Sequence, residues 1–222
     1  MMIKGAIFDF DGTLFDSMFI WDRIGSDYLR SIGYEPQADL DQVFKSMSLY
    51  QAACYYKSEY GVKASTDEII GGVNKMLEHF YIDEVQPKEG VRQFIRKLQD
   101  KGVKMCISTA TDEYLVKAAL KRCDMEFSFS RIFTCSSVGH GKDEPDIFRT
   151  AMHHLGTEKN ETFVFEDAIH AIRTAKNDGF PVAGVYDKSE EKADEVKKLS
   201  DIYLPDYSDF DGFWKAESVL GS

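Results

Sequence analysis

Positive charge is scarce in this sequence. Lysine and arginine contribute 27 residues against 38 aspartates and glutamates, so the 222-residue chain carries a formal net charge of −11 at pH 7. This excess of negative charge argues against nucleic acid or an anionic membrane surface as a partner. Apolar runs long enough to span a membrane are also missing. We therefore expect a globular protein with no nucleic-acid and no membrane partner.

Cysteine and histidine are few and unpatterned. The four cysteines show no C-x-x-C spacing, and the five histidines form no cluster with zinc-ligand spacing. Cys106 and Cys135 lie within apolar, strand-like runs, so both are predicted to be buried free thiols. Residues 1–4 lead directly into an apolar run, which does not resemble a signal peptide. The expected location is a reducing cytoplasm.

Apolar runs alternate with amphipathic segments along most of the chain. Strands are predicted at Ile3–Asp9, Val103–Ser108, Arg131–Cys135, Thr162–Glu166, Val182–Val185 and Ile202–Leu204. Helices are predicted at Val91–Lys101, Glu113–Arg122, Asp146–Leu155, Ile169–Asp178 and Glu190–Leu199. Continuous apolar strands alternating with amphipathic helices are typical of a parallel sheet covered on both faces. The predicted fold class is therefore α/β, with a Rossmann-like, doubly wound parallel sheet as its core.

One interval breaks this alternation. About 75 residues separate the first strand from the helix at Val91, whereas an ordinary βα connection has roughly 2–6. Within it, helices are predicted at Phe19–Ser31, Leu40–Lys45, Tyr50–Tyr60 and Asp67–Tyr81. We predict a catalytic core of residues 1–16 and 86–222 and an inserted α-helical bundle, residues 17–85. This cap domain would lie over the carboxyl ends of the strands, where open α/β sheets bind ligands.

Two carboxylates follow the first strand in the string Asp9-Phe10-Asp11-Gly12-Thr13. Residues at i and i+2 of a strand point to one face. Two carboxylates at such a short separation raise each other's pKa unless a cation or a proton lies between them. A chain seldom keeps such a pair at the end of a buried strand for packing alone. The pattern indicates a nucleophilic aspartate, an acid/base aspartate and a bound Mg²⁺.

The same string recurs near the end of the chain as Asp209-Phe210-Asp211-Gly212. There it follows a loop-like segment rather than an apolar strand. Asp209 is therefore predicted to be a helix N-cap or a turn residue.

Two further polar groups are expected to face the same edge of the sheet. Thr109 and Ala110 end one strand, where a hydroxyl and a backbone amide would suit a phosphoryl oxygen. A helix N-cap is the alternative there, and it fits Thr111 better than Thr109. Lys142 lies in a loop between two strands, and an ordinary solvated lysine is the alternative to a site residue.

Glu166 and Asp167 end another buried strand. Two adjacent acids at such a position are a natural site for a hard cation. Asp167 could instead cap the helix that begins near Ala168, but a cap leaves Glu166 unexplained. His170 follows the pair and either lines the site or lies on the helix surface.

These residues follow one another in a recognisable order. In chain order they are Asp9, Asp11, Thr109, Lys142, Glu166 and Asp167. They resemble the four motifs of the haloacid dehalogenase superfamily, and the similarity covers essentially the whole chain. The predicted insert resembles the α-helical cap of the subfamily that contains β-phosphoglucomutase and phosphoglycolate phosphatase.

The resemblance implies a role for each motif residue. Asp9 would form an aspartyl-phosphate, while Asp11 would protonate the leaving oxygen and then activate water. Thr109 and the Ala110 amide would hold the phosphoryl group, and Lys142 would neutralise charge near Asp9.

Mg²⁺ is the implied cofactor. Asp9, the backbone carbonyl of Asp11 and Asp167 would bind it, with Glu166 either ligating or supporting. The physical reason is that a carboxylate and a phosphate dianion cannot approach closely without cations to screen them.

Three positions depart from the common pattern of the superfamily. Ala110 stands where Asn or Gly is frequent, Ala168 where Ser is frequent and Ala171 where Gly is frequent. All three lie beside the catalytic groups and leave the implied roles of those groups intact.

The implied activity is hydrolysis of a small phosphorylated metabolite by a monomer or weak dimer. A phosphomutase of the β-phosphoglucomutase type is the alternative. In an alignment with that mutase, its histidine falls at Trp21 and its phosphate-binding arginine at Leu49. Trp21 cannot act as a base, and Leu49 cannot pair with a phosphate. Lys45 or Arg23 could substitute for these missing groups. Dehalogenation is disfavoured because it has no use for Asp11.

Non-enzymatic readings fit less well. A signalling receiver also carries acids, a hydroxyl and a lysine on a doubly wound sheet, but it is much shorter and has no need of a cap. A catalytically inactive interaction domain would not be expected to keep every residue that carries the chemistry.

The insert is expected to select the substrate. Ser17, Trp21 and Lys45, together with Phe19 and Met47, are predicted to line the binding site. Packing inside the cap is an equally open interpretation for Phe19 and Trp21. The identity of the substrate stays open at this level.

Overall fold

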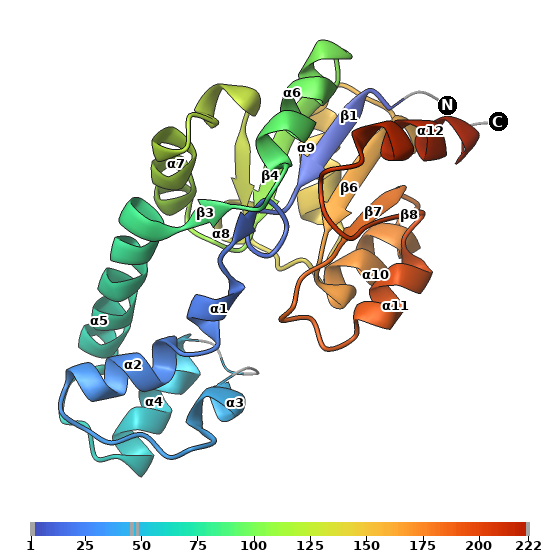
Figure 1. The fold of residues 1–222 in the computed structure, drawn as a ribbon. Coiled ribbons are helices and arrows are strands. Elements are labelled where there is room, and N and C mark those ends of the chain that lie inside the picture. The colour runs from blue at the N-terminus through green and yellow to red at the C-terminus, as the bar shows by residue number, and fades with distance from the viewer. Residues whose placement is uncertain (1–2, 45–46, 48, 221–222) are drawn as a thin grey trace. The chain divides into compact units, whose positions relative to one another are not determined.

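The computed structural model of the chain describes residues 3–44, 47 and 49–220. Contacts between Cα atoms divide the chain into two compact units, one comprising Met1–Asp16 and Gln86–Ser222 and the other Ser17–Val85. Both are drawn in Figure 1. Among the described residues, no helix combines the length and the apolar character needed to cross a membrane.

A six-stranded sheet forms the centre of the first unit. Its strands are β1 (Gly5–Phe8), β4 (Lys104–Thr109), β5 (Ile132–Thr134), β6 (Thr162–Glu166), β7 (Val182–Val185) and β8 (Ile202–Leu204). They lie in the order β5-β4-β1-β6-β7-β8, and every neighbouring pair is parallel. Of the strands that follow β1 in this sheet, β4 and β5 lie on one side of it, and β6, β7 and β8 lie on the other. The carboxyl ends of β1, β4 and β6 therefore meet at one edge, at the point where the strand order reverses.

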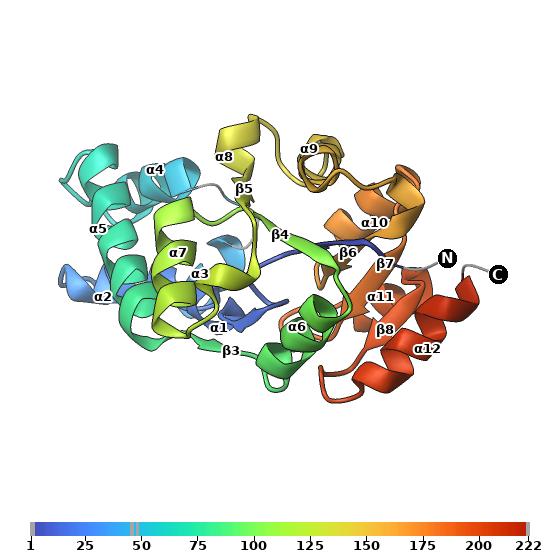
Figure 2. The ribbon, with the colours of Figure 1, turned by 90° about the horizontal axis from the view of Figure 1, so that it is seen from above.

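Helices cover both faces of this sheet. They are α6 (Val91–Asp100), α7 (Glu113–Arg122), α8 (Cys135–Val138), α9 (Asp146–Leu155), α10 (Ile169–Asn177), α11 (Ala193–Leu199) and α12 (Phe210–Leu220), with 3₁₀ turns η2 (Glu126–Ser128) and η3 (Lys159–Glu161). Figure 2 shows α9 and α10 on one face and α6 and α12 on the other.

The two faces have different cores because side chains alternate along each strand. Ile7 and Val164 belong to a hydrophobic cluster with residues of α9, α10 and α11. On the opposite face Phe165 packs against Phe94 of α6 and Phe213 of α12, with ring centroids 5.9 Å and 5.5 Å away. Burial on both faces explains why the strands read as continuous apolar runs. The predicted α/β fold class, with a doubly wound parallel sheet, is confirmed.

Some element boundaries differ from the predictions. Cys135 begins α8 instead of ending β5, because Thr134 forms a capping box with Ser137. Cys135 is consequently only partly buried, whereas Cys106 is buried as predicted, and all four cysteines are free thiols. The last predicted helix begins at Ala193 instead of Glu190.

A short antiparallel ribbon was not predicted. β2 (Phe15–Asp16) pairs with β3 (Gln86–Pro87) where the chain leaves the first unit and returns to it. Pro87 is compatible with this strand because a two-stranded ribbon has only edge strands.

The second unit is helical. It contains α1 (Met18–Trp21), α2 (Ile24–Ser31), α3 (Leu40–Phe44), α4 (Leu49–Glu59), α5 (Thr66–His79) and a π-helical turn, η1 (Phe80–Glu84). The predicted helix Phe19–Ser31 is in fact two helices, α1 and α2. Tyr56 is fully buried at the centre of this unit, and its hydroxyl donates to the carbonyl of Gly25 over 2.7 Å.

Candidate active site

Asp9 follows the last residue of β1, at the carboxyl edge of the sheet. The strand is fully buried, and the backbone N–H of Asp9 still donates to the carbonyl of Phe165 on β6. The chain then turns sharply: Gly12 has φ +73°, a conformation that side-chain-bearing residues rarely adopt. The N–H groups of Leu14 and Phe15 both donate to the carbonyl of Phe10 and close the turn. A buried strand followed by this turn places a carboxylate at the sheet edge.

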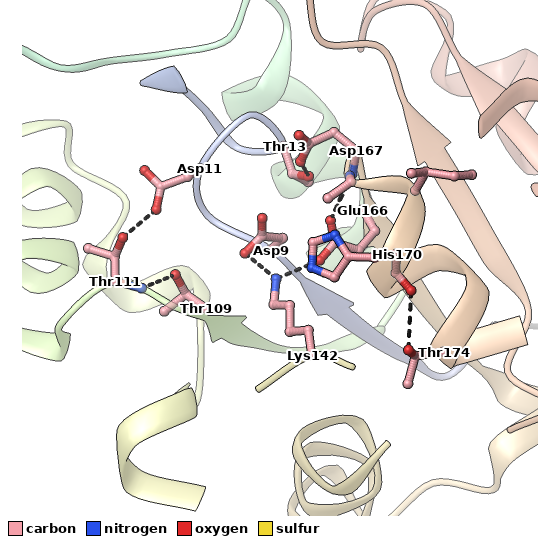
Figure 3. A network of polar contacts seen from close by, with 12 residues as sticks. Asp9, Asp11, Thr13, Thr109, Thr111, Lys142, Glu166, Asp167, His170 and Thr174 are labelled. Carbon is pink, nitrogen blue, oxygen red and sulfur yellow. Dashed lines mark hydrogen bonds and ion pairs between the residues drawn. The ribbon is translucent and has the colours of Figure 1, made fainter. Parts of the chain in front are cut away.

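Lys142 lies between two carboxylates. Its Nζ is 2.5 Å from Oδ1 of Asp9 and 2.5 Å from Oε1 of Glu166, and only 8% of the lysine is exposed. Figure 3 shows the ammonium group bracketed by the two acids. The solvated-lysine alternative is therefore wrong for Lys142. Glu166 also accepts the backbone N–H groups of Asp167 and Ala168 through Oε2, so both of its oxygens are engaged.

The concentration of buried charge perturbs the titration of this cluster. Burial raises the pKa of Asp9 to about 8, and Glu166 adds to the rise while Lys142 opposes it. Burial, Glu166 and Asp9 also raise the pKa of Asp167. Burial disfavours the charged form of Lys142, but Asp9 and Glu166 outweigh it and raise the pKa of that ammonium group. The site holds one fixed cation and an excess of carboxylates.

The side chain of Asp11 is hydrogen-bonded to the loop after β4. The hydroxyl of Thr111 donates to Oδ2 of Asp11, and the N–H of Thr111 donates to Oγ1 of Thr109 over 3.0 Å. Thr109 is fully buried, while Ala110 is exposed. The N-cap of α7 is Asp112, so the helix-cap interpretation of Thr111 is wrong.

Asp167 faces the turn that follows β1. Its Oδ1 accepts a hydrogen bond of 2.6 Å from the hydroxyl of Thr13, and both residues are buried. The N-cap of α10 is Ala168, and its side chain makes no capping bond. The helix-cap interpretation of Asp167 is therefore wrong. His170 is exposed on the first turn of α10.

The predicted binding residues of the insert all belong to the helical unit. Ser17 is buried at the N-cap position of α1. The indole N–H of Trp21 donates to the hydroxyl of Tyr81 over 3.2 Å, and Trp21 lines an apolar cavity of about 120 Å³ with Met47. Phe19 packs edge-to-face on Phe80 at 5.2 Å. Lys45 lies outside the described residues.

The second copy of the aspartate string is structural, as predicted. Oδ1 of Asp209 accepts the N–H of Gly212 over 2.8 Å, three residues into α12. Asp209 thus caps that helix, and Asp211 is exposed on its first turn. Identical strings take different roles because only the first follows a buried strand.

Comparison with known proteins identifies the family. Residues 6–185 match the family described as haloacid dehalogenase-like hydrolase. The chain belongs to this family.

Named relatives carry phosphatase activities. Hexitol phosphatase B of Escherichia coli K12 is 23% identical over 159 residues, which cover 70% of this chain and 71% of the relative. A phosphorylated carbohydrates phosphatase of Thermotoga maritima is 22% identical over 153 residues, covering 69% and 71%. The crystal structure of a putative β-phosphoglucomutase from Thermotoga maritima superimposes with a TM-score of 0.82 at 20% identity, covering 96% of this chain and 99% of that one. At that identity the likeness establishes the fold. This haloacid dehalogenase-like enzyme is a phosphoric monoester hydrolase.

The acidic residues of this hydrolase suit a hard divalent cation. Oxygen atoms of Asp9, Glu166 and Asp167 lie within 4.8 Å of one another, and all three residues are buried. The ammonium group of Lys142 pairs with two of these three carboxylates, those of Asp9 and Glu166. Buried charges without partners are strongly destabilising, and Mg²⁺ binds oxygen ligands of this kind. The donor set therefore fits a divalent cation next to Asp9.

Three site residues were not predicted: Thr13, Thr111 and Tyr207. Thr13 and Thr111 lie within the quoted motifs, but their long-range hydrogen bonds leave no periodic signal. Tyr207 donates to the carbonyl of Thr13 over 3.1 Å from a segment that the sequence marked only as a loop.

Proposed function

We propose that the protein is a Mg²⁺-dependent phosphatase that hydrolyses a small phosphorylated metabolite through a phosphoryl–Asp9 intermediate. The observation that carries the proposal is the position of the Asp9 carboxylate at the sheet edge, in contact with Lys142 and beside Asp167. A nucleophile, a fixed cation and a cation-binding acid in one place are what attack on a phosphate dianion requires.

In the first step, a carboxylate oxygen of Asp9 attacks phosphorus, and the bond from phosphorus to the leaving oxygen breaks. Asp11 gives its proton to that oxygen, which leaves as an alcohol. The contact with Thr111 orients the Asp11 carboxyl group for this transfer. Lys142 offsets the negative charge that accumulates between Asp9 and the phosphoryl group.

In the second step, Asp11 removes a proton from water as the water oxygen attacks phosphorus. The bond between Asp9 and phosphorus breaks, which returns the Asp9 carboxylate and releases inorganic phosphate. Thr109 and the Ala110 amide hold the phosphoryl oxygens in both steps.

The cation would be held by Asp9, the Asp11 carbonyl and Asp167. When bound, Mg²⁺ supplies positive charge that lets the carboxylate and the phosphate approach each other. Glu166 has both oxygens engaged, so its main part in the proposal is to hold Lys142 beside Asp9.

The substrate class follows from the named relatives. A hexitol phosphatase and a phosphorylated carbohydrates phosphatase support a sugar phosphate or a similar monoester. We propose that the helical unit Ser17–Val85 is the cap that selects it, with Ser17, Trp21 and Lys45 as contact residues.

Replacement of the nucleophile tests the covalent mechanism. Asp9→Asn keeps the size of the side chain and removes its charge, so Mg²⁺-dependent turnover of an aryl phosphate should fall by roughly three orders of magnitude or more. Retention of most wild-type turnover by this variant would refute the phosphoryl–Asp9 intermediate.

The repeated aspartate string supplies a control for the metal assignment. Asp167→Ala should raise the Mg²⁺ concentration for half-maximal activity by at least about tenfold, whereas Asp211→Ala, on an exposed helix turn, should leave it unchanged. Equal Mg²⁺ titration curves for these two variants would remove Asp167 from the metal site.

A further inference from the structure

Tyr207 is a buried tyrosine whose hydroxyl reaches the turn after β1. It lies between β8 and α12, is only 2% exposed, and donates to the carbonyl oxygen of Thr13 over 3.1 Å. Its ring packs edge-to-face on Phe94 of α6, with centroids 5.0 Å apart. The side chain is therefore held at its ring and at its hydroxyl.

Thr13 also forms a hydrogen bond with Asp167. Its side-chain hydroxyl donates to Oδ1 of Asp167 over 2.6 Å, and both residues are buried. Thr13 thus accepts a hydrogen bond from Tyr207 at its backbone and donates one to Asp167 from its side chain. The two bonds connect residues separated by 194 and 154 positions in the sequence.

The backbone around Tyr207 is packed to allow this contact. Gly90, with φ +80°, precedes α6, and a Cβ atom there would come within 2.9 Å of the carbonyl carbon of Tyr207. A glycine is therefore required for the two segments to approach. Burial and the carboxylates of Asp167 and Asp9 raise the pKa of Tyr207 well above its ordinary value, so the hydroxyl stays a donor.

A fixed Thr13 limits the motion of the Asp167 carboxylate. Thr13 lies in a turn, and its side chain moves with its peptide plane. If Tyr207 did not hold the Thr13 carbonyl, this buried acceptor would lose a partner and the turn could relax. A hydrogen-bonded partner behind a metal-binding carboxylate commonly changes metal affinity by 10–100-fold when it is removed.

We propose that Tyr207 is a positioning residue of the active site, which acts through Thr13 to hold Asp167 in the orientation that binds the divalent cation. The proposal rests on the proposed function, because it needs Asp167 as a metal ligand. It assigns the segment between β8 and α12 to the active site, although no catalytic group comes from it.

Calorimetric titration of the full chain with Mg²⁺ tests this assignment. Tyr207→Phe keeps the ring and removes the hydroxyl, and it should weaken Mg²⁺ binding about tenfold. Thr13→Val should weaken it by at least as much, and Thr13→Ser, which keeps the hydroxyl, should bind Mg²⁺ nearly as the wild type does. Because Tyr207 acts through Thr13, adding Tyr207→Phe to Thr13→Val should cause little further loss.

Tyr56 supplies a matched control. Its buried hydroxyl donates to the Gly25 carbonyl over 2.7 Å inside the helical unit. Tyr56→Phe removes the same chemical contact, and it should lower stability by an amount similar to that lost in Tyr207→Phe while leaving Mg²⁺ affinity unchanged. In turnover assays, Tyr207→Phe should raise the half-saturating Mg²⁺ concentration and leave kcat at saturating Mg²⁺ within about twofold of wild type.

The outcomes separate this proposal from the proposed function. If the wild type binds Mg²⁺ and folded Tyr207→Phe binds it equally well, the positioning role is refuted and the phosphatase proposal stands. An equal loss of affinity in Tyr56→Phe would also refute it, because the effect would then be general. If the wild type itself binds no Mg²⁺, both proposals fail.

Discussion

The hydroxyl of Thr111 lies 2.5 Å from Oδ2 of Asp11, a residue 100 positions earlier in the chain. Asp11 is the residue that has to move a proton in the proposed reaction, and its side chain is only partly buried. A hydrogen bond from the loop after β4 restricts the orientations available to it. Thr111 is in turn fastened to the end of that strand, because its N–H donates to Thr109.

Removal of this hydroxyl should slow the chemical step. Thr111→Val should lower kcat about tenfold, since a misoriented acid loses part of the 10²–10⁴-fold that acid–base catalysis contributes. Thr111→Ser should restore most of the rate. Thr162→Val is the control. Thr162 is a buried threonine at the start of β6, the end away from the candidate site, and its hydroxyl donates to the carbonyl of Glu158. Steady-state kinetics that show equal kcat for Thr111→Val and Thr162→Val would contradict the orienting role.

Lys142 should matter for stability as well as for turnover. Lys142→Met leaves Asp9 and Glu166 buried without their cation, which should lower the free energy of unfolding by about 3 kcal/mol. The pKa of Lys142 is raised in the folded protein, so its contribution is fully present below the ordinary pKa of lysine, and pH 7 is a suitable condition.

Lys4 provides the comparison for that measurement. It pairs with Glu161 over 2.6 Å, but its side chain is 59% exposed. Lys4→Met should therefore change the unfolding free energy by less than about 1 kcal/mol. Urea denaturation of both variants checks the contrast, and similar small losses for the two would mean that Lys142 is not an essential counter-ion.

The buried ion pair of Asp187 should make the free energy of unfolding depend on pH. Its side chain is 2% exposed and pairs with Lys88, the residue after β3, over 2.8 Å. Burial alone would raise the pKa of Asp187, but hydrogen bonds from Lys88 and Ser189 outweigh it and hold the pKa below its ordinary value. Because the pKa of Asp187 is lower in the folded than in the unfolded protein, its ionised carboxylate stabilises the fold at pH values above the unfolded-state pKa, which is near 3.8. This stabilisation is lost as the pH falls through the lower, folded-state pKa. Asp187→Asn should cost about 2 kcal/mol at pH 7, and the difference from wild type should shrink below about pH 4.

Asp206 is a matched control for this experiment. Its carboxylate accepts hydrogen bonds from the N–H and the hydroxyl of Ser208, just as the Asp187 carboxylate accepts those of Ser189. Asp206 differs because it is exposed and because no lysine pairs with it among the contacts between described residues. Asp206→Asn should therefore cost much less. If chemical denaturation between pH 3 and pH 7 gave parallel curves for wild type and Asp187→Asn, the buried pair would not be the source of the stability.

Hydrolysis should dominate over isomerisation. Trp21 offers no base, since its indole N–H is a donor and is engaged with Tyr81, and Leu49 carries no charge for a second phosphate. The expected result with β-glucose 1-phosphate or a similar monoester is net release of inorganic phosphate with little glucose 6-phosphate. A coupled assay in which isomerisation outpaced phosphate release would favour the phosphomutase alternative.

Much of the fold could be predicted because it is encoded locally. The strands around Ile7 and Val164 are buried on both faces, so their sequences are continuous apolar runs that stand out from the amphipathic helices. The division of Phe19–Ser31 into two helices was missed, because nothing in its periodicity marks the break near Asp22.

The residues that reach the carboxyl edge of the sheet follow from local sequence. Asp9, Thr109 and Asp167 each stand at or just after the end of a buried strand, and parallel strands bring such ends together. The sequence therefore predicted that these side chains would lie at one edge of the sheet before any contact was known.

The pairing of these groups depends on how distant segments pack in the folded chain. Lys142 between Asp9 and Glu166, Thr111 on Asp11 and Tyr207 on Thr13 are contacts between segments far apart in the sequence. A single hydrogen bond across such a distance depends on the direction of one side chain, and it imposes no repeating pattern on the residues around it. Packing of the strands and helices sets those directions, so they emerge only when the whole chain is folded.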